Sequence, residues 1–161
     1  MRVVTWQTGL LRWAFVTVTL LGLIGCAASG PLYGDPNALK PGSSEIVIYR
    51  LDRFARGGVT YLVHLDGKEV AKLQNAGFAV FPVSPGTHEL EIRASALQNF
   101  KPMKVVVESK AGARSYFRFE PFMSSDPVIL PNVIVLPVGY NFIEVPESLA
   151  RVQLLDLRRS E

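Results

Sequence analysis

The chain has very little of the chemistry on which most enzymes and metalloproteins depend. Its 161 residues include one cysteine and two histidines. One cysteine cannot close an intramolecular disulfide, and the sequence has no paired-cysteine, His-x-His or Glu-x-x-His spacing that would bind zinc. It also lacks the Gly-x-Ser-x-Gly and Ser-x-x-Lys signatures of serine nucleophiles and the glycine-rich loop with lysine that holds phosphates. We therefore expect no metal, no cofactor and no enzymatic activity.

Long apolar segments are scarce too, and the clearest one stands near the start of the chain. Residues 1–12 carry two arginines and no acid, and Trp13 to Ile24 then runs without a charge. Small side chains follow from Gly25 to Ser29. This order is typical of a secretory signal peptide. A membrane-spanning helix needs about 20 apolar residues, so the run is too short to predict one.

The single cysteine, Cys26, comes directly after this segment. The residues Leu23-Ile24-Gly25-Cys26 resemble the lipobox of bacterial lipoproteins. The resemblance implies attachment of a diacylglyceryl group to the sulfur of Cys26 through a thioether, cleavage before this residue, and acylation of its new amine with a fatty acid such as palmitate. Several chains on one residue make a stable anchor, whereas a single chain binds a membrane only marginally. The alternative, a free thiol at the end of a spanning helix, is disfavoured because the apolar run is short.

The two residues after the cysteine, Ala27 and Ala28, bear on which membrane holds the anchor. In enterobacterial lipoproteins an aspartate directly after the cysteine retains the protein in the inner membrane. By resemblance, its absence here indicates the outer membrane rather than the inner one, with the folded domain facing the periplasm.

Three segments are expected: a signal peptide over 1–25, a lipidated flexible tether over 26–44 and one folded domain over 45–161. The tether is rich in Pro, Gly, Ser and Ala and has no periodicity. The chain has seventeen basic and fourteen acidic residues, and two of the basic ones, Arg2 and Arg12, belong to the signal peptide. The mature chain is then nearly neutral, so nucleic acid is not an expected partner.

The domain is predicted to be a series of short strands. Polar and apolar residues alternate from Thr87 to Arg93, which is the period-two pattern of a strand with one solvent-exposed face. Asp66-Gly67 is a strong hairpin signal, because a type I′ turn needs positive φ at both central positions. Strands are expected over 45–51, on both sides of Asp66-Gly67 in 59–73, on both sides of Pro85-Gly86 in 78–94, and over 103–109 and 113–121; residues 151–157 are either a strand or part of a short helix begun at Pro146.

This spacing predicts an all-β fold: an antiparallel β-sandwich or open barrel with immunoglobulin-like or transthyretin-like layering. At most one short C-terminal helix is expected, because no interior stretch shows sustained helical periodicity.

The stretch 121–146 is apolar but is interrupted by five prolines. Proline disfavours both a long helix and a central strand, so we expect edge strands and a loop folded over the open end of the sandwich. The alternative is an exposed apolar surface for a partner or lipid. Its residues would be Val128, Ile129, Leu130, Val133, Ile134, Val135 and Leu136.

From about residue 45 to 157 the chain resembles a lipoprotein-borne family known as domain of unknown function 2846. The residues that match are Tyr49-Arg50, the stretch VHLDGKEV at 63–70, NAGF at 75–78, PGTH at 85–88 and a glycine turn before the aromatic strand at 112–119. The family is associated with bacterial envelope lipoproteins and has no settled activity. The resemblance therefore implies a cellular setting and no mechanism.

The remaining polar residues offer few candidate sites. His88 shares a strand face with Leu90 and Ile92, which favours a packed histidine with a backbone partner over a metal ligand. Glu89 and Glu91 point to the same side of one strand, and Arg93 and Lys104 are placed to neutralise them across the sheet. A solvated face is favoured over an acid–base pair.

One cluster is a candidate for binding anionic surfaces, because arginine suits carboxylates and phosphates. It consists of Arg50, Arg53 and Arg56, with Lys68 and Lys72 as possible neighbours. The alternative is an ordinary charged loop.

The function that fits best is a non-enzymatic, membrane-anchored interaction or structural module of the cell envelope, with an envelope protein or peptidoglycan as partner. A small lipid or hydrophobic-ligand carrier that uses 121–142 as a lid, with Phe117, Phe119, Phe122 and Phe142, is the alternative. An enzyme is the weakest of the three hypotheses.

Overall fold

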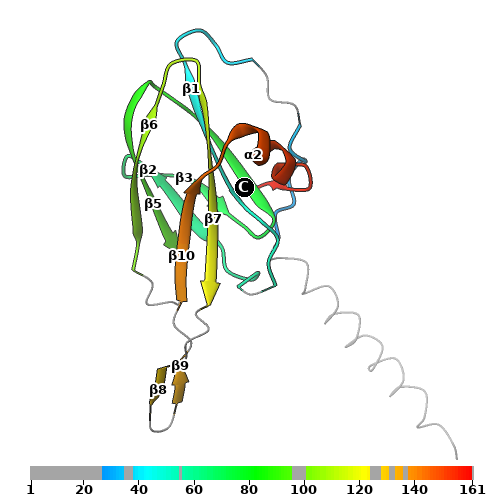
Figure 1. The fold of residues 1–161 in the computed structure, drawn as a ribbon, viewed down its shortest axis with the longest axis vertical. Coiled ribbons are helices and arrows are strands. Elements are labelled where there is room, and N and C mark those ends of the chain that lie inside the picture. Colours follow the sequence, from blue (N-terminus) through cyan, green and yellow to red (C-terminus); the bar gives the residue numbers. More distant parts are fainter. Residues whose placement is uncertain are drawn as a thin grey trace, which may run out of the picture.

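The computed structural model describes residues 27–34, 38–54, 56–95, 101–123, 128–130, 133–135 and 138–160. Within them, two β-sheets pack face to face and a short helix covers the outer side of one sheet (Figure 1). The predicted β-sandwich is confirmed, and so is the single short helix near the C-terminus.

The first sheet has five strands in the order β10-β7-β1-β4-β11. Two of its four pairs are antiparallel, β10 with β7 and β1 with β4, whereas β1 pairs with β7, and β4 with β11, in parallel. The sheet therefore departs from the purely antiparallel arrangement that was expected. The strands are β1 (Ser44–Arg50), β4 (Gly77–Val83), β7 (Arg114–Met123), β10 (Val138–Glu144) and β11 (Arg158–Arg159).

The second sheet has four strands in the order β3-β2-β5-β6, and all of its pairs are antiparallel. Its first hairpin turns at Asp66 (φ 50°) and Gly67 (φ 79°), which confirms the predicted turn with two positive φ angles. The strands are β2 (Tyr61–Leu65), β3 (Lys68–Leu73), β5 (Gly86–Ala94) and β6 (Met103–Ser109).

The central strand β1 is buried on both faces, because the sandwich interior lies on one side and the helix on the other. Ile46 and Ile48 pack between the two sheets, whereas Val47 and Tyr49 pack against helix α2 (Glu147–Leu154). This double burial explains why the sequence of β1 is almost continuously apolar instead of alternating.

The helix begins directly after Pro146, which has no side-chain cap but suits the start of a helix. Ala150 and Leu154 are its buried residues. The chain then returns to the sheet as β11, so residues 151–157 follow the helical alternative and not the strand.

The proline-rich stretch forms more strand than the sequence suggested. Strand β7 runs through Pro121, which is tolerated because β1 pairs with β7 only from Arg114 to Arg118. Beyond that point β7 pairs only with β10, which is the edge strand that was expected.

Two short strands are described between β7 and β10, and neither covers the end of the sandwich (Figure 1). Strands β8 (Val128–Leu130) and β9 (Val133–Val135) pair with each other and extend beyond the body of the domain (Figure 1). The expected covering loop is therefore replaced by a projecting hairpin, because β-branched residues on both sides of Pro131-Asn132 favour strand pairing.

The start of the expected flexible tether is attached to the domain. Ala28 donates a backbone hydrogen bond to the carbonyl of Asn75 at 3.0 Å, and Gly30 and Tyr33 donate to Arg159 and Leu157 at 3.1 Å each. Arg159 in turn donates to Pro31 at 2.8 Å. Residues 27–33 thus extend the first sheet beyond β11, because they supply backbone partners that a composition rich in small residues does not reveal.

Candidate functional site

The loop between β1 and β2 is organised by a buried arginine. Arg50 has no exposed surface, and it donates from Nη1 to the carbonyl of Val59 at 2.6 Å and from Nη2 to the carbonyl of Arg56 at 2.7 Å. Its guanidinium lies 5.1 Å from the ring centre of Tyr61, which is a cation–π distance. Burial lowers the pKa of Arg50, and the two carbonyls and the ring replace the water that its charge has lost.

Arg50 was predicted to bind anionic surfaces, and its burial excludes that role. Its side chain instead points into the domain and ties together both ends of the turn that carries Arg56. Arg56 adopts a left-handed conformation with φ 62° and donates from Nε to the hydroxyl of Tyr61 at 3.1 Å. The three arginines are therefore neighbours, but one of them supports the loop on which the other two lie.

The other end of the same loop is held by Asn75, which precedes β4. Its side chain accepts from the backbone N–H of Arg53 at 3.2 Å and donates to Asp52 at 2.6 Å. The loop is thus held at both of its ends. Its outermost described residue, Phe54, is fully exposed at 105% of its reference area, and the side chain of Arg53 is 58% exposed.

The start of the described chain lies beside this loop. Ala27 forms a parallel bridge with Asn75, the residue that supports Arg53 and Asp52. Residues 27–28 and the loop therefore meet at one end of the sandwich. Cys26, the predicted lipidation site, lies outside the described residues.

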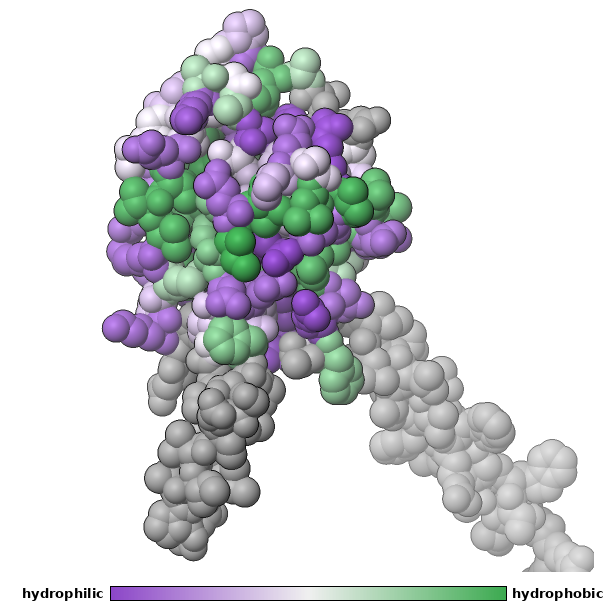
Figure 2. Space-filling model, in the orientation of Figure 1, coloured by the Kyte–Doolittle hydropathy of each residue, from purple (hydrophilic) through white to green (hydrophobic). Residues whose placement is uncertain are grey.

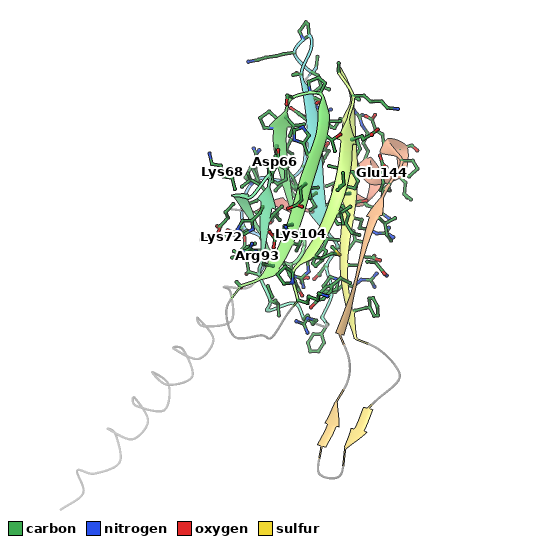
Figure 3. All side chains as sticks on the ribbon, turned by 90° about the vertical axis from the view of Figure 1, so that its left-hand side faces the viewer. Asp66, Lys68, Lys72, Arg93, Lys104 and Glu144 are labelled. Atoms are coloured by element: carbon green, nitrogen blue, oxygen red, sulfur yellow. The ribbon has the colours of Figure 1, made fainter. Side chains whose placement is uncertain are left out.

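Lys68 and Lys72 do not belong to this loop, because they lie on β3 in the second sheet. Figure 3 shows them on the same side of the molecule as Arg93 and Lys104. Acidic partners balance that surface: Arg93 contacts Glu91 through two hydrogen bonds of 2.8 and 2.9 Å, and Lys104 contacts Glu89 at 2.8 Å. The predicted neutralisation of both carboxylates is found, but only the pair of Lys104 with Glu89 joins two strands, because Arg93 and Glu91 lie on the same strand β5. The predicted solvated face is wrong for Glu91, which is buried.

The two histidines lie on strands of the second sheet, His64 on β2 and His88 on β5. His88 is buried, with Nδ1 2.7 Å from Asp66 Oδ2 and Nε2 2.8 Å from the carbonyl oxygen of Ser84, which confirms the packed histidine with a backbone partner. His64 lies opposite Glu69 and Glu91 on neighbouring strands. No group of three or more potential metal ligands occurs within the described ranges.

A second exposed feature is apolar and lies on helix α2 and on the residue that follows it. Leu149, Val152 and Leu155 are 48%, 65% and 61% exposed, although the opposite side of the helix packs on the sheet. Figure 2 shows hydrophobic surface over this part of the molecule, bordered by polar side chains. Such an exposed apolar surface is a candidate protein contact.

The predicted partner surface at 128–136 falls on the projecting hairpin. The backbone of β8 and β9 is described, and Leu136 lies outside the described residues. Of the four phenylalanines that were expected to support a lid nearby, three are inside the sandwich, and Phe122 is 42% exposed. Phe117 stacks on Phe142 at 5.0 Å between ring centres, and Phe119 stacks on Tyr140 at 5.7 Å.

Sequence reasoning missed two residues of the loop, Phe54 and Asn75. Phe54 was visible as an aromatic residue between two arginines in the sequence Arg53-Phe54-Ala55-Arg56. Nothing in the sequence linked Asn75 to this loop, because an asparagine in a turn does not indicate which distant residues its side chain contacts.

No helix in the described part of the chain is both long and apolar enough to cross a membrane. Comparisons of the chain with protein-family models, with curated proteins and with solved structures give no match. The resemblance to domain of unknown function 2846 stays a prediction.

Proposed function

We propose that this protein is a lipid-anchored lipoprotein of the bacterial outer membrane, whose periplasmic β-sandwich is a non-enzymatic interaction module. The lipobox-like sequence that ends at Cys26 supports the anchor. The observation that carries the proposal is the attachment of the next residues, Ala27 and Ala28, to Asn75 of the sandwich.

This attachment leaves almost no free chain between the lipid and the domain. Consecutive Cα atoms are about 3.8 Å apart, so a lipid on Cys26 would leave the protein within one residue of its folded body. A free tether would let the domain rotate and move away from the bilayer. The observed arrangement instead supports a domain held close to the membrane in one orientation.

A domain held in this way needs a surface for its partner, and the exposed side of α2 is the best-defined one. Leu149 and Val152 project from α2, and Leu155 from its C-cap position, and the helix is fixed by Ala150 and Leu154 beneath it. Apolar side chains on a rigid element lose little conformational entropy when a partner covers them. An envelope protein is therefore the favoured partner over peptidoglycan, whose sugars and peptides are polar.

The alternative function, a carrier of lipid or another hydrophobic ligand, is less well supported. It used the region 121–142 as a lid, supported by Phe117, Phe119, Phe122 and Phe142. Three of these rings, Phe117, Phe119 and Phe142, belong to the core between the sheets, and Phe122 alone is exposed. Native mass spectrometry separates the two functions: a co-purifying lipid beyond the covalent anchor supports the carrier, and a mass without it supports the interaction module.

Mass analysis of the native protein tests the anchor. The expected mature chain begins at Cys26 and carries diacylglyceryl and acyl groups on that residue. Replacement Cys26→Ser removes the thiol that accepts the lipid, so we expect an unprocessed precursor. An intact Met1 in the wild-type protein, or an unmodified thiol at Cys26, would contradict the proposal.

Photo-cross-linking in living cells tests the partner surface. A photoreactive residue at Val152 is expected to give a defined cross-linked product that Leu149→Asp together with Leu155→Asp abolishes. The matched control is the same probe at Lys110, an exposed turn residue between β6 and β7. Equal products from both positions, or none from Val152, would contradict an interaction surface on α2.

A further inference from the structure

We propose that residues 52–54 and 56–57 of the loop between β1 and β2 form a membrane contact, in which Phe54 enters the interface of the bilayer and Arg53 pairs with the phosphates of anionic lipids. The inference deepens the proposed function, because it depends on the lipid anchor at Cys26 for the orientation of the domain. It adds a contact between the folded domain and the membrane to the one that the lipid anchor makes.

The first step is the position of the loop. Ala27 is paired with Asn75, whose side-chain oxygen accepts from the backbone N–H of Arg53 at 3.2 Å. One asparagine therefore contacts both the segment that leaves the anchor and the loop that carries Phe54. An anchor at Cys26 places this loop beside the membrane surface.

The second step is the exposure of Phe54. Single exposed apolar residues are common on protein surfaces, but most of them still rest partly on their neighbours. No described residue reduces the exposed area of Phe54, which is 105% of the reference value. Covering such a side chain is favourable because it removes apolar area from water, and phenylalanine is among the residues that interfacial segments bury at the headgroup–acyl boundary.

The third step is the rigidity of the loop. Arg50 holds the carbonyls of Arg56 and Val59, and Asn75 holds Asp52 and Arg53. The backbone N–H of Gly57 also donates to the carbonyl of Phe54 at 3.1 Å. These hydrogen bonds fix the backbone of the loop and so keep the side chain of Phe54 in solvent. Without them the side chain would fold back onto the domain.

The fourth step is charge. The loop carries Arg53 and Arg56 against one acid, Asp52, whose carboxylate is bound by Asn75. Arg53 contacts Glu120 at 3.6 Å; the arginine side chain is 58% exposed, the glutamate side chain is 21% exposed, and Glu120 also contacts Arg118 at 3.1 Å. Glu120 therefore keeps a cationic partner when Arg53 turns to a lipid phosphate. Basic residues near an anionic membrane surface are attracted to it.

The same end of the domain offers a second aromatic side chain. Phe122 follows Glu120 by two positions on β7, so both side chains point to the same face of the sheet, and Phe122 is 42% exposed. The pair Arg53–Glu120 joins this face to the loop.

A single-tryptophan experiment tests the loop in the intact protein. The two tryptophans of the chain, Trp6 and Trp13, lie in the signal peptide, so the processed variant Phe54→Trp has one reporter. The lipidated protein is reconstituted into vesicles of phosphatidylethanolamine and phosphatidylglycerol that contain lipids brominated on the acyl chains. We expect a blue shift of the emission and about twofold quenching, as for a side chain at the headgroup–acyl boundary.

The matched control is Lys110→Trp at the opposite end of the domain. The residues around Lys110 contact Ser43 at the start of β1, and the seven residues of β1 separate that end from the loop by roughly 20 Å. We expect no quenching at this position. Replacement of phosphatidylglycerol by phosphatidylcholine, or addition of Arg53→Glu to Phe54→Trp, should reduce the quenching because the phosphate contact is lost.

The possible results distinguish a failure of the membrane-contact loop from a failure of the lipid anchor. An acylated, processed Phe54→Trp protein whose emission equals that of the Lys110→Trp control overturns the membrane-contact loop and leaves the anchor intact. A retained Met1 in the same sample overturns both, because the orientation argument starts at the anchor. Strong quenching that does not respond to lipid charge or to Arg53→Glu supports insertion of the side chain at position 54 and overturns the phosphate contact.

Discussion

The carbonyl oxygen of Val59 accepts a hydrogen bond of 2.6 Å from Nη1 of Arg50, nine residues earlier in the chain. This bond joins the end of β1 to the residues before β2, so it connects the two sheets of the sandwich. A fully buried guanidinium therefore determines where the chain crosses from one sheet to the other.

Replacement Arg50→Met should destabilise the domain by about 2–4 kcal/mol, because two buried carbonyls lose their donors. Arg50→Lys should cost less, since an ammonium group can still reach one of the two carbonyls. Urea unfolding measures both, and hydrogen exchange at Val59 should accelerate most. An Arg50→Met variant as stable as the wild type would show that the desolvation cost of the buried charge cancels its hydrogen bonds.

Much of the sandwich was predictable because its strands and turns have patterns that can be recognised from neighbouring residues in the sequence. Alternation in residues 87–93 and the Asp66-Gly67 turn each depend on neighbours in the sequence, and both are found as expected. The parallel pairing of β1 with β7 was not predictable, because it joins segments about seventy residues apart. Period-two patterns define the faces of a strand but not its partners.

The candidate site was predicted less well, for a related reason. A run of arginines indicates positive charge, but the sequence does not show which of them is buried. Arg50 ends a strand whose residues are buried on both faces, whereas Arg53 lies beyond the end of the strand. The attachment of residues 27–33 was also hidden, because backbone hydrogen bonds carry no side-chain signature.

Replacement Gly30→Ala should detach the N-terminal segment from the sheet. A Cβ at Gly30 would lie 2.5 Å from the carbonyl oxygen of Arg159 and 2.9 Å from its Cβ, so residue 30 or strand β11 must move. We expect faster hydrogen exchange at Tyr33 and Arg159, with less than about 2 kcal/mol lost in global stability.

The matched control for this prediction is Gly34→Ala. A Cβ at Gly34 meets no atom within 4 Å, so exchange at Tyr33 and Arg159 should stay as in the wild type. Equal exchange rates in the two variants would contradict a close approach at Gly30.

Replacement Phe119→Ala should destabilise the domain by about 3–5 kcal/mol, because it removes a fully buried ring from the interior. Phe119 lies 4.7 Å from the ring centre of Tyr61 and 5.7 Å from that of Tyr140, so its loss removes one ring contact from each of these neighbours. The comparison variant Phe122→Ala changes a ring that is 42% exposed and should cost about 1 kcal/mol or less. Similar losses in urea unfolding for both variants would contradict this assignment of the core.

The contact between His88 and Asp66 predicts how stability depends on pH. Both ring nitrogens of His88 face acceptors, Asp66 Oδ2 at 2.7 Å and the carbonyl oxygen of Ser84 at 2.8 Å. Only the doubly protonated ring can donate to both. The hydrogen bond with Asp66 and the bond to Ser84 raise the pKa of His88 above 6.5, and the bond with His88 lowers the pKa of Asp66 below 3.8.

The sign of the effect follows from linkage. A raised histidine pKa stabilises the folded state fully below pH 6.5 and loses that contribution as the pH rises through the folded-state pKa. A lowered aspartate pKa contributes above pH 3.8 and is lost as the pH falls through the folded-state value. The urea midpoint should therefore be highest between these limits and should fall from pH 6 towards pH 9. Asp66→Asn keeps the acceptor for the N–H of Glu89 but removes the carboxylate charge, so it should flatten the alkaline limb of this profile. An unchanged limb in Asp66→Asn would show that another group produces it.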